Sequence, residues 1–378
     1  MKDRPIAFIC PSLSWGGLEM NVFRLALWLK MRGRKIILYG HPDAVLYDNC
    51  RKESIEVREL RSRSKFGDLF LAYRLARQLK KDKARIAVLH MNKNFLLMTL
   101  AKALSGNYFN LIYMQHMHVG ASKRDPYHHW VYSQLDAWVT PLDLFKDDVA
   151  HKTRINRERI EVIPFGIELE QFTDHKPSKT VARKRLQIPS DVLVAGVVGR
   201  LDPKKGQHVL IEACHKLHQQ GHQLHLLLVG DKSKNEETGY AERLHEMVAE
   251  YGLSDFVHFR SYMADIEYAF AAMDIFALTS KSETYGMVTI EAMASGLAVI
   301  GTAEGGTVDI IDDGVNGLLV EPLDVEQLRQ ALLKLITDRE FAARISSRAR
   351  EDALAKYSHR HQCDLLESLF DRLVTGSA

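Results

Sequence analysis

The sequence predicts an α/β protein with two domains, each a doubly wound parallel sheet with helices on both faces. Three observations predict this class. The chain has 378 residues, which is long for one domain and suits two. In both halves, short apolar runs of buried-strand type alternate with helical patterns, an order typical of parallel sheets. A polar stretch interrupted by Pro177 separates the halves, and we interpret residues 168–190 as a linker.

The first half begins with an apolar run at 5–10, followed by a loop that contains Gly16 and Gly17 and then by an amphipathic helix. The next expected strands are 35–39, 55–60, 86–90, 111–115 and 137–140, with helices over 68–81, 94–104 and 142–151. The loop lacks the G-x-G-x-x-G spacing of a dinucleotide site. Ligands in such sheets bind beyond the carboxyl ends of strands. Gly16 and Gly17 lie at one such end, and His116 and His118 lie at another.

The second half repeats the alternation of strands and helices. The expected strands are 192–198, 224–229, 257–259, 275–278, 297–300 and 318–320. The expected helices are 206–219, 239–251, 266–272, 284–294, 325–337 and 339–355, with a final helix at 358–374. Two of the turns before these helices combine charged residues with glycine, and these turns carry the main functional signal.

The first of these turns leads into the helix at 284–294. Its free backbone N–H groups at a helix N-terminus are suited to a phosphate. Glu283 and Glu291 lie eight residues apart, one in the loop and one in the helix. Carboxylates accept hydrogen bonds and therefore suit sugar hydroxyls, which donate them. Phosphate and hydroxyl recognition side by side points to a nucleotide-sugar.

The second turn runs Gly199-Arg-Leu-Asp-Pro-Lys-Lys-Gly206 and opens the helix at 206–219. Arg200 and Lys205 flank it. Two cations close to a helix N-terminus favour a dianionic phosphate, through their charge and through the N–H donors together. The alternative is a pair of solvated cations.

Taken together, these motifs resemble those of the retaining glycosyltransferases of family 4, the glycosyl transferases group 1, which have the GT-B fold. The resemblance rests on Glu283 and Glu291 as an E-x7-E signature, on the turn with Arg200 and Lys205, and on Gly230-Asp231 and Asn316-Gly-Leu-Leu-Val in the same order. It is dense from 193 to 355, and before that it consists of short motifs such as Gly16-Gly17-Leu-Glu19.

The resemblance implies two Rossmann-like domains that face a cleft. Residues 1–167 would form the acceptor-side domain and 191–355 the nucleotide-sugar-binding domain. Residues 356–378 would form a C-terminal helix that crosses back to the first domain. Two positions depart from the family pattern: Ser261 stands where many members have glycine, and Asp309 where glutamate is usual.

The resemblance also implies roles for individual residues. Gly16 and Gly17 would lie under the donor phosphates, and Arg200 and Lys205 would hold the diphosphate. Glu283 would hold the sugar hydroxyls and Glu291 the ribose. Backbone contacts would come from Thr284, Gly286 and Met287. His116, or alternatively His118, would face the donor sugar, so that His116 and Glu283 are the expected catalytic residues through position and charge.

The implied reaction transfers a sugar from a UDP- or GDP-sugar to a glycan or lipid-linked acceptor, with retention of the anomeric configuration. No Asp-x-Asp metal motif occurs in the sequence, so we expect no metal and no cofactor. Two alternatives stay open. An enzyme of the same fold could carry out other chemistry, such as epimerisation of a nucleotide-sugar; a phosphorylase would need a pyridoxal phosphate lysine, for which no context is apparent. A non-catalytic scaffold could have kept the fold.

Charge is distributed unevenly along the chain. Residues 1–165 hold 28 Lys and Arg against 16 Asp and Glu, and the remainder holds 23 against 32. A basic first half implies an anionic partner for that half. Cations and apolar residues interleave from Arg61 to Arg85, which suits an anionic membrane surface, or equally an ordinary packed helix with a solvated basic face. No nucleic-acid recognition module is visible.

The remaining features bear on compartment. The four cysteines are scattered without a C-x2-C pair, so neither a zinc site nor a disulfide framework is expected. The sequence has no long uncharged apolar run, and its first residues do not resemble a signal peptide. We therefore expect a cytoplasmic protein. A peripheral position on the inner face of the plasma membrane is compatible with these features.

Overall fold

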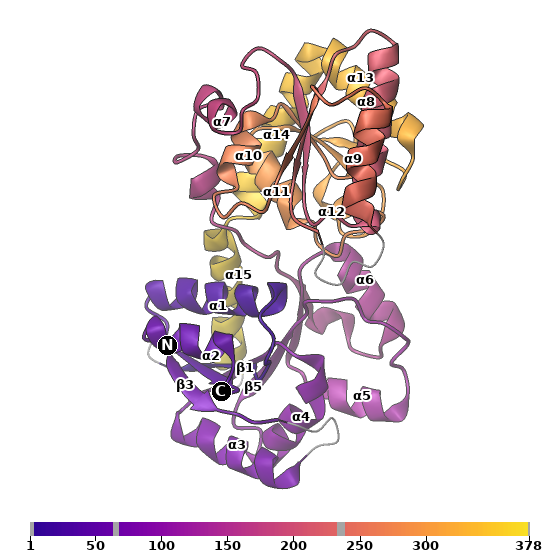
Figure 1. Ribbon diagram of the computed structural model, residues 1–378. Coiled ribbons are helices and arrows are strands. Elements are labelled where there is room, and N and C mark those ends of the chain that lie inside the picture. The colour runs from indigo at the N-terminus through magenta and orange to yellow at the C-terminus, as the bar shows by residue number, and fades with distance from the viewer. Residues whose placement is uncertain (1–3, 63–67, 233–238, 377–378) are drawn as a thin grey trace. The chain divides into compact units, whose positions relative to one another are not determined.

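The computed structural model describes residues 4–62, 68–232 and 239–376 (Figure 1). The chain divides into two compact units. The first contains Met1–Gly166 together with His359–Ala378, and the second contains Ile167–Ser358. Each is an α/β unit around its own parallel sheet, and each is described by itself below.

The first unit contains a seven-stranded sheet within its described residues, in the order β3-β2-β1-β4-β5-β6-β7. All neighbouring strands are parallel. The strands are β1 Ile6–Cys10, β2 Ile36–Gly40, β3 Glu56–Glu59, β4 Ile86–Leu89, β5 Asn110–Met114, β6 Ala137–Thr140 and β7 Ile160–Val162. The order reverses beside β1, which lies between β2 and β4. The loops after β1 and β4 therefore flank the point where such sheets bind ligands.

Helices cover both faces of this sheet. Figure 1 shows α1 and α2 on one face and α3 and α4 on the other. The helices are α1 Gly17–Met31, α2 Val45–Lys52, α3 Leu69–Lys81, α4 Phe95–Leu104, α5 Pro126–Ser133, α6 Asp143–Lys152 and the C-terminal α15 His359–Thr375, with short 3-10 turns at Asn92–Asn94 and Arg157–Arg159.

The C-terminal helix α15 is attached to the first unit by charged contacts with the end of α1. Arg34 has only 5% of its side chain exposed, and its Nε donates to Glu367 at 2.7 Å. Arg32 donates to the same carboxylate at 2.8 Å. Two guanidinium groups on one partly buried carboxylate make a geometrically specific contact. This contact explains how a segment so distant in sequence belongs to the first unit.

The second unit contains a six-stranded parallel sheet among the residues described, in the order β10-β9-β8-β11-β12-β13. The strands are β8 Val194–Val198, β9 His225–Val229, β10 Val257–Arg260, β11 Ile275–Ala277, β12 Ala298–Thr302 and β13 Leu318–Val320. Here the order reverses beside β8, which lies between β9 and β11. The loops after β8 and β11 are therefore the expected ligand-binding loops.

Figure 1 shows α8, α9 and α13 on one face of this sheet and α7, α10 and α11 on the other, where α14 packs against α11. The helices are α7 Lys179–Arg185, α8 Gln207–Gln219, α9 Tyr240–Glu250, α10 Glu267–Ala272, α11 Met287–Ala294, α12 Thr307–Ile310, α13 Val325–Thr337 and α14 Arg339–Lys356, with 3-10 turns at Leu169–Phe172 and Pro203–Lys205. Within the described part of the chain, none of the helices is long and apolar enough to cross a membrane.

The segment 168–190, which we predicted to be a linker, is folded onto the second unit. It contains the 3-10 turn Leu169–Phe172 and helix α7. Arg183 in α7 is 3% exposed and donates to the carbonyl of Ala272 at 3.0 Å and to Asp274 at 2.8 Å. The polar, Pro-interrupted character on which we based the linker prediction gives no sign that a carboxylate distant in sequence holds this arginine in the interior.

Smaller differences concern element ends and short helices. The helix predicted over 284–294 begins at Met287, because Gly286 adopts a left-handed conformation with φ of +83° and caps it. Helices α2 and α5 were not predicted. Asp125 caps α5 by accepting from the N–H of His128 at 3.1 Å, and Pro126 occupies the first helical position. The start signals of α5 are thus present in the sequence, whereas α2 has no side-chain cap, and each of the two helices spans only eight residues.

Candidate active site

Three loops of the second unit meet at the carboxyl edge of its sheet. They follow β8, β11 and β12 and comprise residues 199–206, 278–286 and 303–306; we call them the edge loops. Arg200 and Lys205 lie in the first edge loop, and Glu283, Thr284 and Gly286 in the second. Because adjacent parallel strands end at the same edge, residues predicted from separate motifs come together here.

Hydrogen bonds to backbone carbonyls tie the edge loops to one another. The N–H of Lys281 donates to the carbonyl of Lys204 at 2.8 Å, and the hydroxyl of Thr279 donates to the carbonyl of Lys205 at 2.8 Å. The N–H of Gly306 donates to the carbonyl of Glu283 at 2.7 Å. The three loops therefore form one connected frame.

Two glycines make this close approach possible. Gly206 has φ of +68°, and a Cβ there would lie 2.1 Å from the carbonyl oxygen of Thr279. Gly305 has φ of +70°, and a Cβ there would lie 2.2 Å from the carbonyl oxygen of Glu283. Side chains do not fit at such distances, and L-residues rarely adopt these backbone angles. Glycine at both positions is thus a structural requirement of the frame.

The frame carries a charged cluster around Glu283. The ammonium of Lys205 forms an ion pair with Oε1 of Glu283. The hydroxyl of Ser280, which is 1% exposed, donates to the same oxygen at 2.8 Å. Sequence reasoning predicted Lys205 and Glu283 but missed both their pairing and Ser280. The position of Ser280 directly after a buried strand, three residues before Glu283, is the signal that could have revealed it.

Other predicted residues surround this cluster. Arg200 is exposed, and no carboxylate within the described ranges forms an ion pair with its guanidinium. Thr284 is exposed, Met287 starts α11, and Glu291 lies half-buried one turn further along that helix. The first turn of α11 contains no acidic residue. Its N–H groups and partial positive charge are therefore directed at the edge loops without competition from a nearby carboxylate in that turn.

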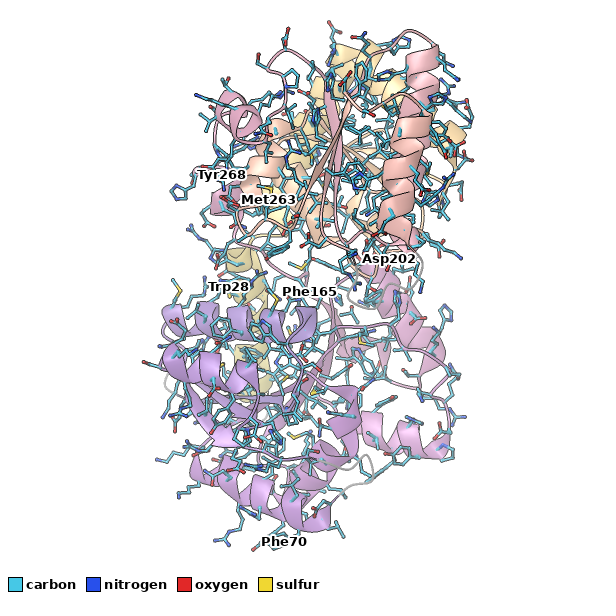
Figure 2. All side chains as sticks on the ribbon, viewed as in Figure 1. Trp28, Phe70, Phe165, Asp202, Met263 and Tyr268 are labelled. Atoms are coloured by element: carbon cyan, nitrogen blue, oxygen red, sulfur yellow. The ribbon has the colours of Figure 1, made fainter. Side chains whose placement is uncertain are left out.

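Asp202 has a structural role in the first edge loop. It lies at the carboxyl edge of the sheet (Figure 2), and its carboxylate accepts from the N–H of Lys204 at 2.9 Å. This contact caps the turn Pro203–Lys205 that precedes α8. The loop sequence between Arg200 and Lys205 is thus explained by the need to hold those two cations in place.

In the first unit, the loop after β1 is held by Glu19. This side chain is 5% exposed; it accepts from the N–H of Gly16 at 2.9 Å and from the hydroxyl of Ser12. Neither Gly16 nor Gly17 has a positive φ, and a Cβ on Gly17 would meet nothing within 4 Å. The backbone itself therefore does not require glycine at position 17, and the space beside it is open.

His116 follows β5 and contacts the buried His90. Its Nε2 lies 3.1 Å from Nδ1 of His90, and its ring stacks on Phe165 with centroids 5.2 Å apart. Burial lowers the pKa of His116 to about 3, and burial followed by the neighbouring His116 lowers the pKa of His90 well below its ordinary value. Both rings are consequently neutral at pH 7.

Sequence reasoning missed His90, although a signal for it exists. His90 directly follows β4, and His116 lies beyond the end of β5, the neighbouring strand. Two histidines at adjacent strand ends are expected to meet. The other candidate, His118, is exposed and packs edge-on against Phe145 with centroids 4.1 Å apart; burial is the main cause that lowers the pKa of its ring.

The predicted residues thus fall into two groups. Seven lie in the second unit on or next to the edge loops: Arg200, Lys205, Glu283, Thr284, Gly286, Met287 and Glu291. Three lie in the first unit at the carboxyl ends of β1 and β5: Gly16, Gly17 and His116. A cation-rich frame with hydroxyl acceptors is chemically suited to a phosphorylated sugar.

Comparison with known proteins agrees with this geometry. The model of the family "Glycosyl transferases group 1" matches residues 178–352, and that of "Glycosyltransferase Family 4" matches residues 15–171. The chain belongs to the glycosyltransferases of family 4. The first match contains all seven predicted residues of the second unit, and the second match contains the three of the first unit.

Individual family members show how far the similarity extends. A D-inositol 3-phosphate glycosyltransferase of Stackebrandtia nassauensis is 34% identical over 240 residues, which are 62% of this chain and 53% of that protein. The lipopolysaccharide core biosynthesis glycosyltransferase LpsE of Rhizobium meliloti is 29% identical over 231 residues, 60% of this chain and 65% of that protein. The chain spans about half the length of the first of these relatives.

A solved structure with the same fold is that of HepE from Anabaena in complex with UDP. It has a TM-score of 0.82 and 22% identity, and the match covers 97% of this chain and 99% of that one. The predicted class, two doubly wound parallel-sheet units of the GT-B type, is confirmed.

Proposed function

We propose that this chain is a retaining glycosyltransferase that moves a sugar from a nucleoside diphosphate sugar to a glycan or lipid-linked acceptor without a metal ion. The observation that carries the proposal is the cluster on the edge loops, where Lys205, Ser280 and Glu283 make contact. Arg200 lies in the same frame without an ion-pair partner among the described residues. Cations for a diphosphate and an acceptor for sugar hydroxyls thus occupy one edge of one sheet.

The diphosphate would bind to Arg200, Lys205 and the N-terminus of α11. Departure of a nucleoside diphosphate places negative charge on its terminal oxygens, and preorganised cations and N–H donors stabilise that charge. The ammonium of Lys205 forms an ion pair with Glu283 in the structure. A bound diphosphate would compete for this ammonium and leave Glu283 free to accept from sugar hydroxyls.

The sugar and ribose would be held by the two glutamates. Ser280 keeps the carboxylate of Glu283 oriented from a buried position, independently of Lys205. Glu291 would accept from the ribose hydroxyls, and Thr284, Gly286 and Met287 would contribute backbone contacts. Carboxylates are acceptor-only groups, which matches the donor character of hydroxyls.

His116 would act in its neutral form. A ring with a pKa of about 3 carries no proton to donate as an imidazolium at pH 7. We therefore assign His116 a hydrogen-bonding role towards the donor sugar rather than that of a general acid. In a same-face retaining transfer, the leaving phosphate itself would accept the proton of the acceptor hydroxyl, so that no enzymic acid is required.

The nature of donor and acceptor is supported by related proteins. HepE of Anabaena was solved with UDP, and LpsE of Rhizobium meliloti is named for lipopolysaccharide core biosynthesis. We propose a UDP- or GDP-sugar as donor and a cell-surface polysaccharide or glycolipid precursor as acceptor.

The deciding experiment measures slow hydrolysis of the donor without acceptor, across UDP-, GDP- and ADP-sugars, with and without EDTA. We expect release of one nucleoside diphosphate, unaffected by EDTA and lost in Glu283→Gln. Glu321→Gln is the matched control, because it makes the same substitution at an exposed glutamate outside the edge loops. Isomerised sugar without release would favour an epimerase. No turnover, together with no thermal shift from any nucleotide, would favour a scaffold and overturn the proposal.

We further propose that α3 attaches the protein to an anionic membrane surface. Leu69, Phe70 and Tyr73 in α3 are 64%, 69% and 48% exposed, and Figure 2 shows Phe70 on the outer side of this helix. Arg74 and Arg77 lie over the rings of Phe70 and Tyr73, each at 5.8 Å from the centroid. Exposed apolar side chains flanked by cations are typical of surface-bound helices. Residues 63–67 of the predicted basic segment lie outside the described residues.

This attachment is tested by co-sedimentation with vesicles that contain anionic lipid, at increasing salt. We expect binding at low salt that weakens as salt rises, and that is reduced in Phe70→Ser. Met31→Ser is the control, because Met31 is 78% exposed on α1. Absence of sedimentation at low salt, or equal loss in both variants, would contradict the role of α3.

A further inference from the structure

A second cation-rich cavity lies in the second unit, at the opposite edge of the sheet from the edge loops. Its volume is about 490 Å³, and it lies beside the residues that precede β11 and β12, which begin at Ile275 and Ala298. The edge loops follow the other ends of these strands. We call this space the basic cavity; the lining residues that matter here are Lys176, Lys179, Asp274, Gly296, Arg339 and Ser346.

Positive charge in the basic cavity is not offset by acidic residues of its wall. Asp274 is the acidic member of the lining, and its two oxygens are already engaged by Lys179 at 2.6 Å and by Arg183 at 2.8 Å. Neither Lys176 nor Arg339 forms an ion pair with any residue that the structure describes. Arg350 adds a further cation, because its Cδ would lie 3.8 Å from a Cβ on Gly296.

Lys176 is the deepest of these cations. Its side chain is half-buried, and its ammonium donates to the carbonyl of Ser295. Burial lowers the pKa of Lys176, and the neighbouring Arg350 and Lys179 lower it further. Desolvating a cation beside other cations is unfavourable unless an anion accompanies it. The wall of this cavity supplies no free anion.

A buried hydroxyl next to the cavity also lacks a partner. Ser295 is 5% exposed, and its Oγ makes no hydrogen bond within the described part of the chain. It directly precedes Gly296, which lines the cavity, and its own carbonyl receives Lys176. Buried hydroxyls are normally satisfied, so an unpaired one calls for an explanation.

We propose that the basic cavity is a binding site for a phosphate group, either free phosphate or a phosphate monoester on a small molecule such as a sugar. A dianionic phosphate matches the half-buried ammonium of Lys176 together with the exposed guanidinium of Arg339, neither of which has an ion-pair partner among the described residues. Helix α14 begins at Arg339, but Asp338 caps its N-terminus by accepting from the N–H of Phe341, and Glu340 lies in its first turn. The side-chain cations, and not this helix end, therefore supply the positive charge. The volume lies within the usual range of small-molecule sites, roughly 300–1,000 Å³.

This site is distinct from the candidate active site. Helix α11 begins at Met287 beside the edge loops and ends at Ala294, directly before Ser295. The two regions thus lie at opposite ends of one helix. We expect a phosphate compound in the basic cavity to bind independently of phosphate groups on Arg200 and Lys205.

The test is isothermal titration of the full chain carrying Arg200→Ala and Lys205→Ala, which removes the cations of the edge loops. Inorganic phosphate and glucose 6-phosphate are titrated separately at constant ionic strength. We expect saturable binding of at least one of them, weakened about tenfold or more by Lys176→Gln with Arg339→Gln, because two charge-assisted contacts are lost. Arg344→Gln is the matched control, since Arg344 is an exposed cation of the same helix outside the lining.

The arms of this experiment separate the sources of phosphate. Equal binding of both compounds identifies free phosphate as sufficient, whereas tighter binding of glucose 6-phosphate identifies a phosphorylated sugar. Arg339→Gln alone changes an exposed residue, and it provides a folded variant should the double substitution unfold. Absence of saturable binding of either compound, or binding that the Lys176 and Arg339 substitutions leave unchanged, overturns the proposal.

Discussion

The two units present functional residues at the carboxyl ends of their strands in different ways. In the second unit, the edge loops hold Lys205 against Glu283, and Arg200 lies in the same frame without an ion-pair partner among the residues described. In the first unit, the corresponding edge holds two neutral histidines and a glycine loop braced by Glu19. The contrast teaches that two units of the same fold can present different chemistry at the same edge of their sheets: charged side chains in the second unit, and neutral rings with a glycine loop in the first.

The largest expected effect tests the charge of the second unit. Lys205→Ala is expected to lower kcat/KM for the nucleotide-sugar by about 10²–10³-fold, because the proposed function makes Lys205 one of the preorganised groups that would stabilise the leaving diphosphate. Lys204→Ala, a change of the neighbouring exposed lysine in the same turn, is the control and should change kcat/KM little. Steady-state kinetics on both variants would decide. Equal losses would remove Lys205 from the proposed site.

The frame itself can be broken at Gly206. Gly206→Ala places a methyl group against the carbonyl of Thr279, and we expect it to lower the free energy of unfolding by about 2–3 kcal/mol through steric strain. Gly221→Ala is the matched control: its φ is +84°, but a Cβ there would meet nothing within 4 Å. Urea denaturation followed by circular dichroism measures both. If the two variants lose the same stability, the positive φ of the backbone, and not the close contact between the loops, explains why glycine is needed at position 206.

The neutral histidines of the first unit predict a specific pH dependence. Between pH 6.5 and about 3, the unfolded chain binds a proton at position 116 that the folded chain excludes. The free energy of unfolding therefore rises with pH in this range. It decreases by about 1–2 kcal/mol when the pH is lowered from 7 to 5. All four tryptophans lie in residues 1–166, so tryptophan fluorescence reports unfolding of the first unit.

The variant for this measurement is His116→Gln, with His118→Gln as control. His116→Gln should reduce the loss of stability between pH 7 and pH 5, whereas the exposed His118 should matter less. A loss that is the same in the wild type and in His116→Gln would mean that His116 titrates normally. In that case the contrast between neutral histidines in the first unit and charged side chains in the second unit would not hold.

The smallest expected effect concerns Ser280, whose hydroxyl donates to the carboxylate of Glu283. Ser280→Ala should lower kcat by up to about tenfold with little change in KM, because one hydrogen bond that fixes the carboxylate is lost. Ser280→Thr keeps the hydroxyl and should restore much of kcat. Ser282→Ala, at an exposed position of the same loop, is the control. A merely structural role of Ser280 would instead lower stability and leave kcat of the folded protein unchanged.

Much of this architecture could be predicted from local sequence patterns. The strands of both sheets are apolar runs such as Ile6–Cys10 and His225–Val229, whose burial on both faces makes them easy to recognise. Arg200, Lys205 and Glu283 were predicted because glycine, charge and helix-start signals coincide over a few residues. Helix α7 was missed because Arg183 is buried by Asp274, a partner 91 residues away.

The sequence by itself determined the parallel α/β class, the strand ends at which functional residues gather, and the residue types suited to phosphate and hydroxyl groups. These properties depend on local periodicity and chemistry. Only the tertiary structure decided that Lys205 and Glu283 pair, that Ser280 shares their contact, and that His90 faces His116. The contacts of Lys205 with Glu283 and of His90 with His116 join residues that follow different strands, and their distances depend on how adjacent parallel strands align.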